Sequence, residues 1–454
     1  MGATPSVAKL VENLTSESSD EQETAVQELC SIAVRSERRE FLAKKDVIPP
    51  LVKLLASGSP KARELSAATL SHLALHAPNH KRIADADAVR PLVDLLRSGT
   101  PKQQGAAAVA LINLSKRSPC NQDAVGECGA IPLLVNLLRD GVPRVQEWAC
   151  VALGNLALQH SANQQRVAEA GAIPQLISTF DTISQHATAS SWLPFASTCS
   201  RRSSSLNPTV SASDQGGAHT PEAVSFFLKA LSSVVYNCPA NQLLFCEAGG
   251  VEAMLKVITT NEVEVLSALC NVVGTASTNG AVVSAGAIPV FVRVVTRGNQ
   301  QTKAIAAGLL GSLAAESQDC RSWIAEQGGI RPLVELAKNG CTEGKLRAVM
   351  ALCVLAEGDQ ENKSEIGTVG GIPVLIRLQN DKLPQMKMWS MRALSNLATD
   401  HKENDERIVA AGGTVLPSLG GMKITAVPDD AVASVDPLKR NSAGTQVNKH
   451  EASS

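Results

Sequence analysis

The chain has 454 residues, of which 44% are hydrophobic and only 3% aromatic, and its formal net charge at pH 7 is −1. With almost no net charge, the chain as a whole is not attracted electrostatically to nucleic acid or to an anionic membrane. With so few aromatic rings, it is not expected to bind nucleic-acid bases by stacking. The 11 cysteines include no CxxC pair. Because Cys30, Cys150, Cys270 and Cys353 fall within helical patterns, we expect buried thiols in a reducing compartment, and neither a disulfide framework nor a metal site.

The N-terminus carries a short lipidation pattern. Gly2 with Ser6 has the spacing of an N-myristoylation signal. No polybasic run follows, and the first cysteine is Cys30, so a single myristoyl chain would attach only weakly. No signal peptide or long apolar stretch is present, and we expect a cytoplasmic protein that lies on a membrane only if Gly2 is myristoylated.

A short motif then recurs along the chain. Its best copies read Gly-Ala-Ile-Pro and begin at Gly129, Gly171 and Gly286. Further copies begin at Asp46, Asp87, Gly249, Gly328, Gly370 and Gly412. Successive intervals between the nine starts are 41, 42, 42, 78, 37, 42, 42 and 42 residues. A second element, Ala-Leu-x-Asn-Leu in its best copies, keeps the same spacing, which predicts a repeat protein.

The chemistry of one unit predicts helices. Gly ends one helix in a left-handed conformation, and Pro at or near the first turn favours the start of the next. A Leu-Val-x-Leu-Leu stripe at helical spacing follows, and then an Ala-rich helix whose small residues permit close packing. Because no unit can bury its apolar face alone, the units must stack into a continuous core.

These two elements resemble the armadillo repeat, over roughly residues 5–420. The resemblance implies an all-α, right-handed superhelical α-solenoid of about nine repeats of ~42 residues, with a concave groove lined by the third helix of each unit. Within the family the spacing is most similar to the vacuolar protein 8-like group, in which a myristoylated Gly favours the lipidated interpretation of Gly2.

The long interval divides the repeats into residues 1–180 and 221–420. Residues 181–220 form a Ser/Thr-rich segment, interpreted as a disordered insertion between the second and third helices of one unit. It is either an inert loop or a regulatory one, in which Ser204 follows Arg201-Arg202 as a basophilic kinase site. Residues 421–454 are predicted to be a disordered tail.

Groove residues follow from helical geometry, since positions four and seven before the Asn lie near whole turns from it. In the armadillo family the equivalent Asn side chains bind the backbone of an extended peptide, and the resemblance therefore nominates Asn113, Asn155, Asn271 and Asn396. The other candidates are Trp148, Val151, Phe226, Lys229, Arg347, Trp389 and Arg392. Two alternatives stay open: the Asn side chains could tie one unit to the next, and the Trp rings could be packing residues.

The resemblance does not extend to nuclear-import adaptors. In the importin-α type a Trp precedes the Asn by four residues, whereas this chain has Val109, Val151, Ser267 and Arg392 there. Arg392 would also repel a Lys-rich ligand.

No nucleotide, metal-protease, hydrolase or calcium-loop signature occurs. We therefore predict a non-catalytic scaffold that binds extended segments of other proteins, with no cofactor, metal, nucleic acid or small-molecule substrate. One alternative is an N-myristoylated tether to a vacuole or another organelle. A further alternative is the substrate-recognition component of a ubiquitin ligase, with the ligase domain on another chain.

Overall fold

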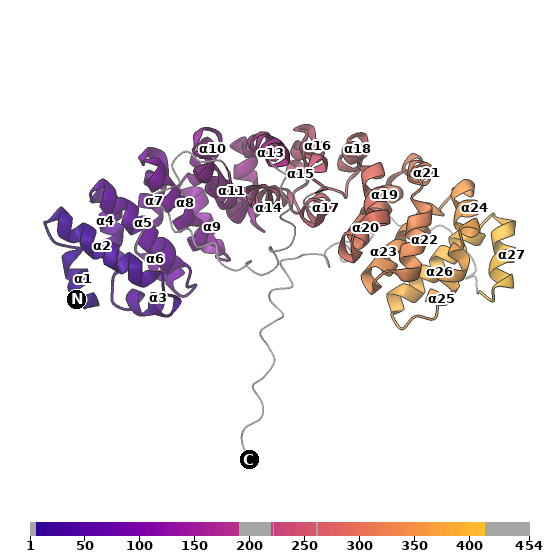
Figure 1. Cartoon of the computed structure of the whole chain (residues 1–454), viewed down its shortest axis with the longest axis horizontal. Helices are drawn as coiled ribbons and strands as arrows, with labels where there is room; N and C mark the ends of the chain where they lie inside the picture. Colours follow the sequence, from indigo (N-terminus) through magenta and orange to yellow (C-terminus); the bar gives the residue numbers. More distant parts are fainter. Residues whose placement is uncertain (1–5, 190–218, 221, 260–261, 414–454) are drawn as a thin grey trace, which may run out of the picture. The chain divides into compact units, whose positions relative to one another are not determined.

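The computed structural model describes residues 6–189, 219–220, 222–259 and 262–413. Within these ranges every regular element is a helix, 27 in all, and no strand occurs. The chain divides into two compact units, Met1–Ala253 and Met254–Ser454. Figure 1 shows the succession of helices within each unit.

The helices fall into three sets that alternate along the chain. The short first helices are α3 Ser36–Ala43, α6 Asn79–Asp85, α9 Pro119–Glu127, α12 Ser161–Glu169, α15 Pro239–Glu247, α18 Ala276–Ser284, α21 Gln318–Glu326, α24 Gln360–Thr368 and α27 Lys402–Ala410. The second helices are α1 Val7–Asn13, α4 Ile48–Ser57, α7 Val89–Ser98, α10 Ala130–Asp140, α13 Ala172–Ala189, α16 Gly250–Lys256, α19 Ala287–Arg297, α22 Ile330–Asn339 and α25 Gly371–Leu378. The third helices are α2 Ser19–Ala33, α5 Pro60–Ala74, α8 Pro101–Ser115, α11 Pro143–Ala157, α14 Ala223–Val235, α17 Glu262–Cys270, α20 Gln300–Glu316, α23 Thr342–Leu355 and α26 Pro384–Ala398.

The predicted junction between first and second helices is confirmed. Gly129 has φ 76° and Gly286 has φ 77°, both in the left-handed region that costs a side chain about 1–2 kcal/mol. The other Gly anchors also have positive φ, and Asp46 and Asp87 adopt the same conformation at φ 53° and 56°. The anchor therefore marks a required backbone geometry and not merely a composition preference.

Small residues allow the third helices to approach closely. A Cβ atom on Gly154 of α11 would lie 2.8 Å from Ala230 Cα of α14, so the two backbones are nearly in contact there. In the second unit, a Cβ on Gly311 of α20 would lie 3.4 Å from Ala351 Cα of α23. The third helices pack in succession, α2 to α14 in the first unit and α17 to α26 in the second.

A second asparagine series, on the first helices, was not recognised in the sequence. Its members are buried, and Asn163 is typical: its Nδ2 donates to the carbonyl of Leu156 at 3.1 Å and to that of Gln122, one repeat earlier, at 2.9 Å. The series consists of Asn79, Asn121, Asn163, Asn241, Asn279, Asn362 and Asn404. In the second unit Asn404 donates in the same way to Leu397 and Lys363. Four of these amides, those of Asn79, Asn163, Asn241 and Asn404, each tie a third-helix carbonyl to the adjacent first helix.

The predicted insertion starts too early. Helix α13 continues through Asp181 to Ala189, because Phe180 and Ile183 extend its apolar stripe and are buried. Residues 190–218, together with the tail from residue 414, lie outside the described residues.

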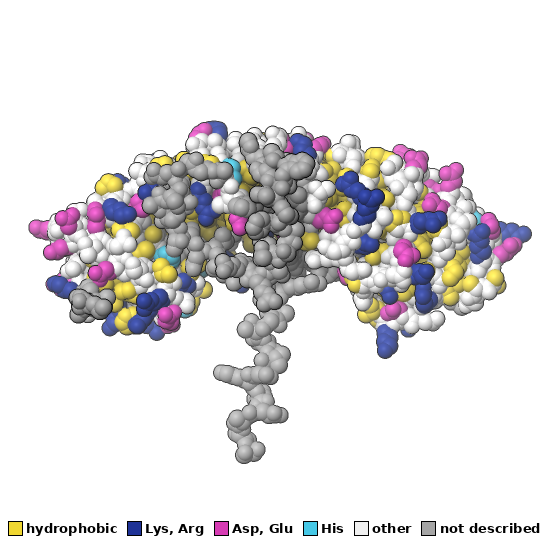
Figure 2. Space-filling view, in the orientation of Figure 1, with side chains coloured by type: hydrophobic (Ala, Val, Ile, Leu, Met, Phe, Trp, Pro, Cys, Tyr) yellow, Lys and Arg dark blue, Asp and Glu magenta, His cyan; other side chains and the backbone are white. Residues whose placement is uncertain are grey.

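The surface carries no single dominant charge. Figure 2 shows acidic and basic side chains interspersed with apolar ones over the viewed face, in keeping with the net charge of −1. No single helix among the described residues is long and apolar enough to cross a membrane, although α18 and α19, bent by 78°, meet that criterion as a pair.

Candidate functional site

Four of the predicted groove residues form one accessible surface on α11 and α14, which we call the α11–α14 patch: Val151, Asn155, Phe226 and Lys229. Val151, Asn155 and Phe226 are half-buried, and Lys229 is exposed. The close approach at Gly154 sets the two helices side by side.

The amide of Asn155 is available for a ligand. Among the described residues none forms a hydrogen bond with its side chain, and only its main-chain carbonyl is used, accepting from Gln122 Nε2 at 2.6 Å. A half-exposed amide can both donate to and accept from a passing peptide backbone.

Asn113 and Asn396 have the alternative role. Asn113 is 4% exposed, and its Nδ2 donates to the carbonyl and the hydroxyl of Ser71 on α5, at 3.2 and 3.1 Å. Asn396 Nδ2 donates to the carbonyl of Cys353 on α23 at 2.9 Å. Both amides brace one third helix against the previous one. Asn271 is half-buried and lies one residue beyond the end of α17.

The two tryptophans are packing residues. Trp148 is 8% exposed and Trp389 is 6% exposed. The Trp148 ring fills the space above Gly105 of α8, where an added Cβ would lie 2.1 Å from its Cζ3 atom. Arg144 covers the Trp148 ring at 5.1 Å, and Arg392, itself half-buried, lies 5.8 Å from the Trp389 ring. Neither ring is an exposed anchor.

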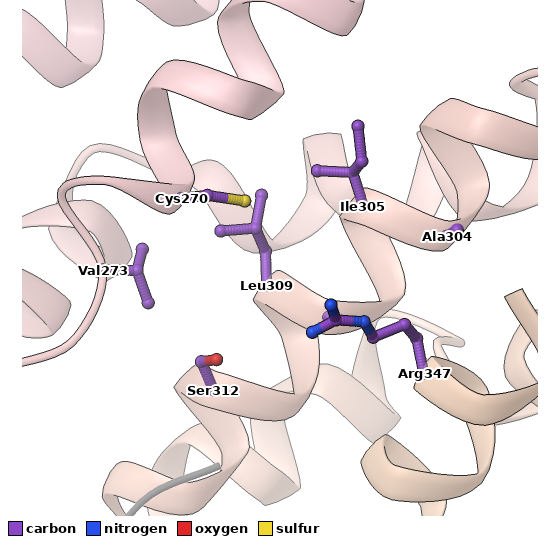
Figure 3. Close-up of a pocket in the computed structure, with 8 residues that line it drawn as sticks. Cys270, Val273, Ala304, Ile305, Leu309, Ser312 and Arg347 are labelled. Atoms are coloured by element: carbon purple, nitrogen blue, oxygen red, sulfur yellow. The ribbon is translucent and has the colours of Figure 1, made fainter. Parts of the chain in front are cut away.

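Arg347 closes a small cavity in the second unit. Its side chain is buried, its Nε donates to Glu343 Oε1 at 2.7 Å, and its stem passes over Gly308. Figure 3 shows it extending from α23 toward Leu309 and Ser312 of α20. The cavity, of about 20 Å³, is large enough for roughly one water molecule and too small for a peptide side chain.

Four cysteines, on α11, α15, α17 and α23, have unreactive thiols. Burial raises the pKa of the Cys270 and Cys353 thiols to about 12 and that of Cys246 to about 11. Burial also raises the pKa of Cys150 well above its usual value. Such thiols stay protonated at neutral pH and are poor nucleophiles and metal ligands. In the described part of the chain, no cluster of His, Cys, Asp or Glu could hold a metal ion.

Glu147 anchors the last two residues of the predicted insertion, His219 and Thr220. Its carboxylate is 1% exposed and accepts from the Thr220 N–H at 2.6 Å and from the Thr220 hydroxyl at 3.0 Å. Arg144 Nη1 donates to it at 2.7 Å, and His219 Nδ1 lies 3.4 Å away. The chain segment at His219 and Thr220 is thereby held on α11 beside Trp148. No sequence signal pointed to this contact.

His72 occupies an Asn position of the third-helix series, in α5. It is 4% exposed, and its Nδ1 has no hydrogen-bond partner in the part of the chain that the structure describes. Burial, followed by the nearby Arg39 guanidinium, lowers the pKa of His72. The unfolded chain therefore binds a proton below about pH 6.5 that the folded chain resists, so stability falls as the pH drops below that value.

We expect His72→Asn to reduce this pH dependence. An Asn there could donate to the carbonyl of Cys30, as Asn113 does to Ser71 and Asn396 to Cys353, with a gain of about 1 kcal/mol. Urea unfolding of both proteins at about pH 7 and about pH 5 measures the effect. Equal losses of stability in the two proteins would show that His72 does not titrate on unfolding.

Two predicted modification sites, Gly2 and Ser204, lie outside the described residues. Ser6, which completes the pattern at Gly2, has a structural role: it is the N-cap of α1, where its Oγ accepts from the Lys9 N–H at 3.3 Å. Helix capping alone is sufficient to explain a Ser at this position.

Comparisons with known proteins agree with this architecture. Residues 35–75 and 118–158 match the Armadillo/beta-catenin-like repeat family. The structure is similar to that of an engineered protein, with a TM-score of 0.76 and 26% identity, covering 95% of this chain and 97% of that one. It is also similar to a structure from work on a phosphorylation switch that controls the interaction between cadherin and beta-catenin, with a TM-score of 0.68 and 15% identity, covering 90% and 73% of the two chains. No curated protein matches the chain in sequence. The chain thus has the all-α armadillo-repeat fold, and two of its segments, residues 35–75 and 118–158, match the armadillo/beta-catenin-like repeat.

Proposed function

We propose that the protein is a non-catalytic adaptor that binds extended segments of partner proteins on the face of its third helices. The α11–α14 patch carries this proposal, because the Asn155 amide, which no described residue hydrogen-bonds, lies among accessible side chains of varied chemistry. The amide suits any peptide backbone, Val151 and Phe226 offer apolar contact, and Lys229 favours an acidic segment. An interaction between two proteins, cadherin and beta-catenin, is the subject of one similar structure, which supports the same kind of function here.

The test changes the α11–α14 patch and leaves Asn113 and Asn396, whose amides hold neighbouring third helices together, unchanged. A variant with Asn155→Ala, Phe226→Ala and Lys229→Glu is used to capture partners from native lysate, with mass spectrometry of the bound proteins. We expect the variant to lose a defined set of the wild-type partners, each weakened at least about tenfold, because the few side chains that dominate an interface cluster near its centre and cost about 2 kcal/mol or more when truncated.

A matched control variant carries Asn136→Ala, Phe41→Ala and Lys53→Glu. These three residues are exposed and lie on first and second helices. The control variant should retain those partners. If the control loses them too, or if the patch variant keeps them while circular dichroism shows it to be folded, binding does not occur at the α11–α14 patch and the proposal is wrong.

A second candidate function, a lipid-anchored organelle tether related to the vacuolar protein 8-like group, depends on Gly2. Gly2→Ala would then shift the protein from the membrane fraction to the soluble fraction, and an unchanged distribution would exclude it. Without lipidation we place the protein in the cytoplasm. The third candidate, a ubiquitin-ligase recognition subunit, requires a ligase among the captured partners.

A further inference from the structure

Four basic side chains surround one open pocket in the second unit. Lys338 is in the last turn of α22, Lys345 near the start of α23, Arg377 in the last turn of α25, and Lys382 in the loop before α26. The pocket has a volume of about 440 Å³, and its other lining residues are Leu378, Asn380 and Asp381. Dark-blue Lys and Arg side chains are visible over these helices in Figure 2.

The charge of the pocket is not neutralised from within. Four cations and one carboxylate line it, which leaves a net charge of +3. None of the four cations forms an ion pair with another described residue. The one carboxylate, Asp381, accepts from the Leu383 N–H at 2.9 Å, within its own loop. Like charges gathered around one pocket repel one another, so an anion in the pocket would relieve this repulsion.

Nearby carboxylates are engaged elsewhere. Glu335 on α22 accepts a hydrogen bond from Asn339, and Glu343 on α23 accepts from Arg347 at 2.7 Å. Both point to partners on their own helices, and neither lines the pocket.

Other copies of the repeat do not show this arrangement. A basic residue in the last turn of a second helix interacts favourably with the helix dipole, so such residues occur in other copies too. In two of those copies the charge is neutralised, because Arg97 pairs with Asp94 at 2.8 Å and Arg139 with Asp140 at 2.9 Å. In the repeat that contains α8, the position equivalent to Lys345 is the uncharged Gln104. Its side-chain amide donates to the carbonyl of Leu96 at 3.2 Å.

Lys382 is a further departure from the repeat. It stands where earlier copies have a glycine after the second helix, such as Gly141 and Gly340. The combination of the four cations is therefore particular to these two adjacent repeats and is not required by the fold, although single members recur: Lys387 stands at the register of Lys345, and Arg293 at that of Arg377.

We propose that this pocket binds a small polyanion carrying two or more phosphoryl groups, either as a free solute or as the headgroup of a phosphoinositide lipid. One phosphoryl group carries about −1.5 to −2 charges and would leave the pocket positive, whereas two groups match +3. The lysines supply mobile point charges, and the Arg377 fork can pair with one phosphate in bidentate fashion. The volume falls within the range of about 300–1,000 Å³ found for small-ligand sites.

This inference goes beyond the proposed adaptor function and stands independently of it. No lining residue belongs to the α11–α14 patch, which is in the other unit. Loss of partner capture and loss of polyanion binding are thus separate results, obtained with separate variants.

The test is calorimetric titration of the full chain with myo-inositol hexakisphosphate, alongside sedimentation with phosphatidylcholine vesicles that contain phosphatidylinositol bisphosphate. We expect Lys345→Gln/Arg377→Gln to weaken binding of the preferred probe by at least about tenfold, since two of the four cations that attract the phosphates are lost. Binding should also weaken as salt is raised. Preference for the soluble probe or for the vesicles identifies which source supplies the phosphates.

A control pair, Lys387→Gln/Arg293→Gln, removes the same charges at the same repeat registers but outside the pocket. It should bind as the wild type does. Equal weakening in the two variants would mean that the probes respond to overall charge, and absence of binding to both probes would equally overturn the proposal.

Discussion

Trp148→Ala should lower the free energy of unfolding by about 3–5 kcal/mol, the usual cost of truncating a large buried aromatic side chain. The ring is 8% exposed and fills the space that Gly105 leaves on α8. Urea unfolding followed by circular dichroism measures the change. A binding anchor would give a different result, in which stability is nearly unchanged and partner capture is lost.

Gly105 makes this prediction more specific. Gly105→Ala should cost about 1–3 kcal/mol, because the new methyl group would overlap the ring. With Trp148→Ala already present, the same change fills empty space and should cost nothing or stabilise. The two losses are then strongly non-additive, as expected for residues in contact. Additive losses would show that the ring does not pack on Gly105.

Trp323 provides a comparison of the same residue type. It is half-buried on α21, so Trp323→Ala should cost clearly less than Trp148→Ala. A similar cost for the two would indicate that burial is not the reason for the effect at Trp148.

The helical repeat could be predicted because its signals are local. An αL residue, a Pro near the next helix start and an apolar stripe each depend on a few neighbouring residues, as Gly129, Ile131 and Leu134 in and before α10 illustrate. Their recurrence near 42 residues then required stacking.

The roles of the third-helix asparagines could not be predicted, because they depend on the neighbouring helix. Asn113 meets the carbonyl and hydroxyl of Ser71, whereas Asn155, at the same register, has no such bond among the described residues. The outcome depends on which groups the neighbouring third helix presents to the amide, and the sequence pattern does not report this. The first-helix series is different, because Asn79, Asn121 and Asn163 recur at 42-residue spacing, and this signal is local to the sequence.

The repeat pattern also does not predict polar contacts between segments that are far apart in the sequence. Glu147 and Thr220 are 73 residues apart, and no periodicity connects them. The basic pocket is partly predictable from the sequence. Lys345 and Lys382 lie in adjacent repeats, and stacking of the repeats places such positions near each other.

Glu147→Ala should cost about 2–4 kcal/mol, because it leaves the Thr220 N–H and hydroxyl without their acceptor and removes the partner of Arg144. Arg144 is about 30% exposed and regains water, which keeps the cost below that of a fully buried pair. Urea unfolding gives the magnitude. Hydrogen exchange locates it, since the Thr220 amide should lose its protection in the variant.

Glu147→Gln separates charge from hydrogen bonding at this contact. The amide oxygen can still accept from the Thr220 N–H, so exchange there should remain slower than in Glu147→Ala, while the ion pair with Arg144 is lost. As a control, Glu127→Ala removes an exposed carboxylate 3.8 Å from Arg166 and should change stability by less than about 1 kcal/mol. If Glu147→Ala behaved like this control and Thr220 exchanged at the same rate as in the wild type, Glu147 would not hold the segment on α11. Slow exchange in wild type, intermediate in Gln and fast in Ala would instead show that one buried carboxylate joins the end of the insertion to the helix that carries Val151 and Asn155.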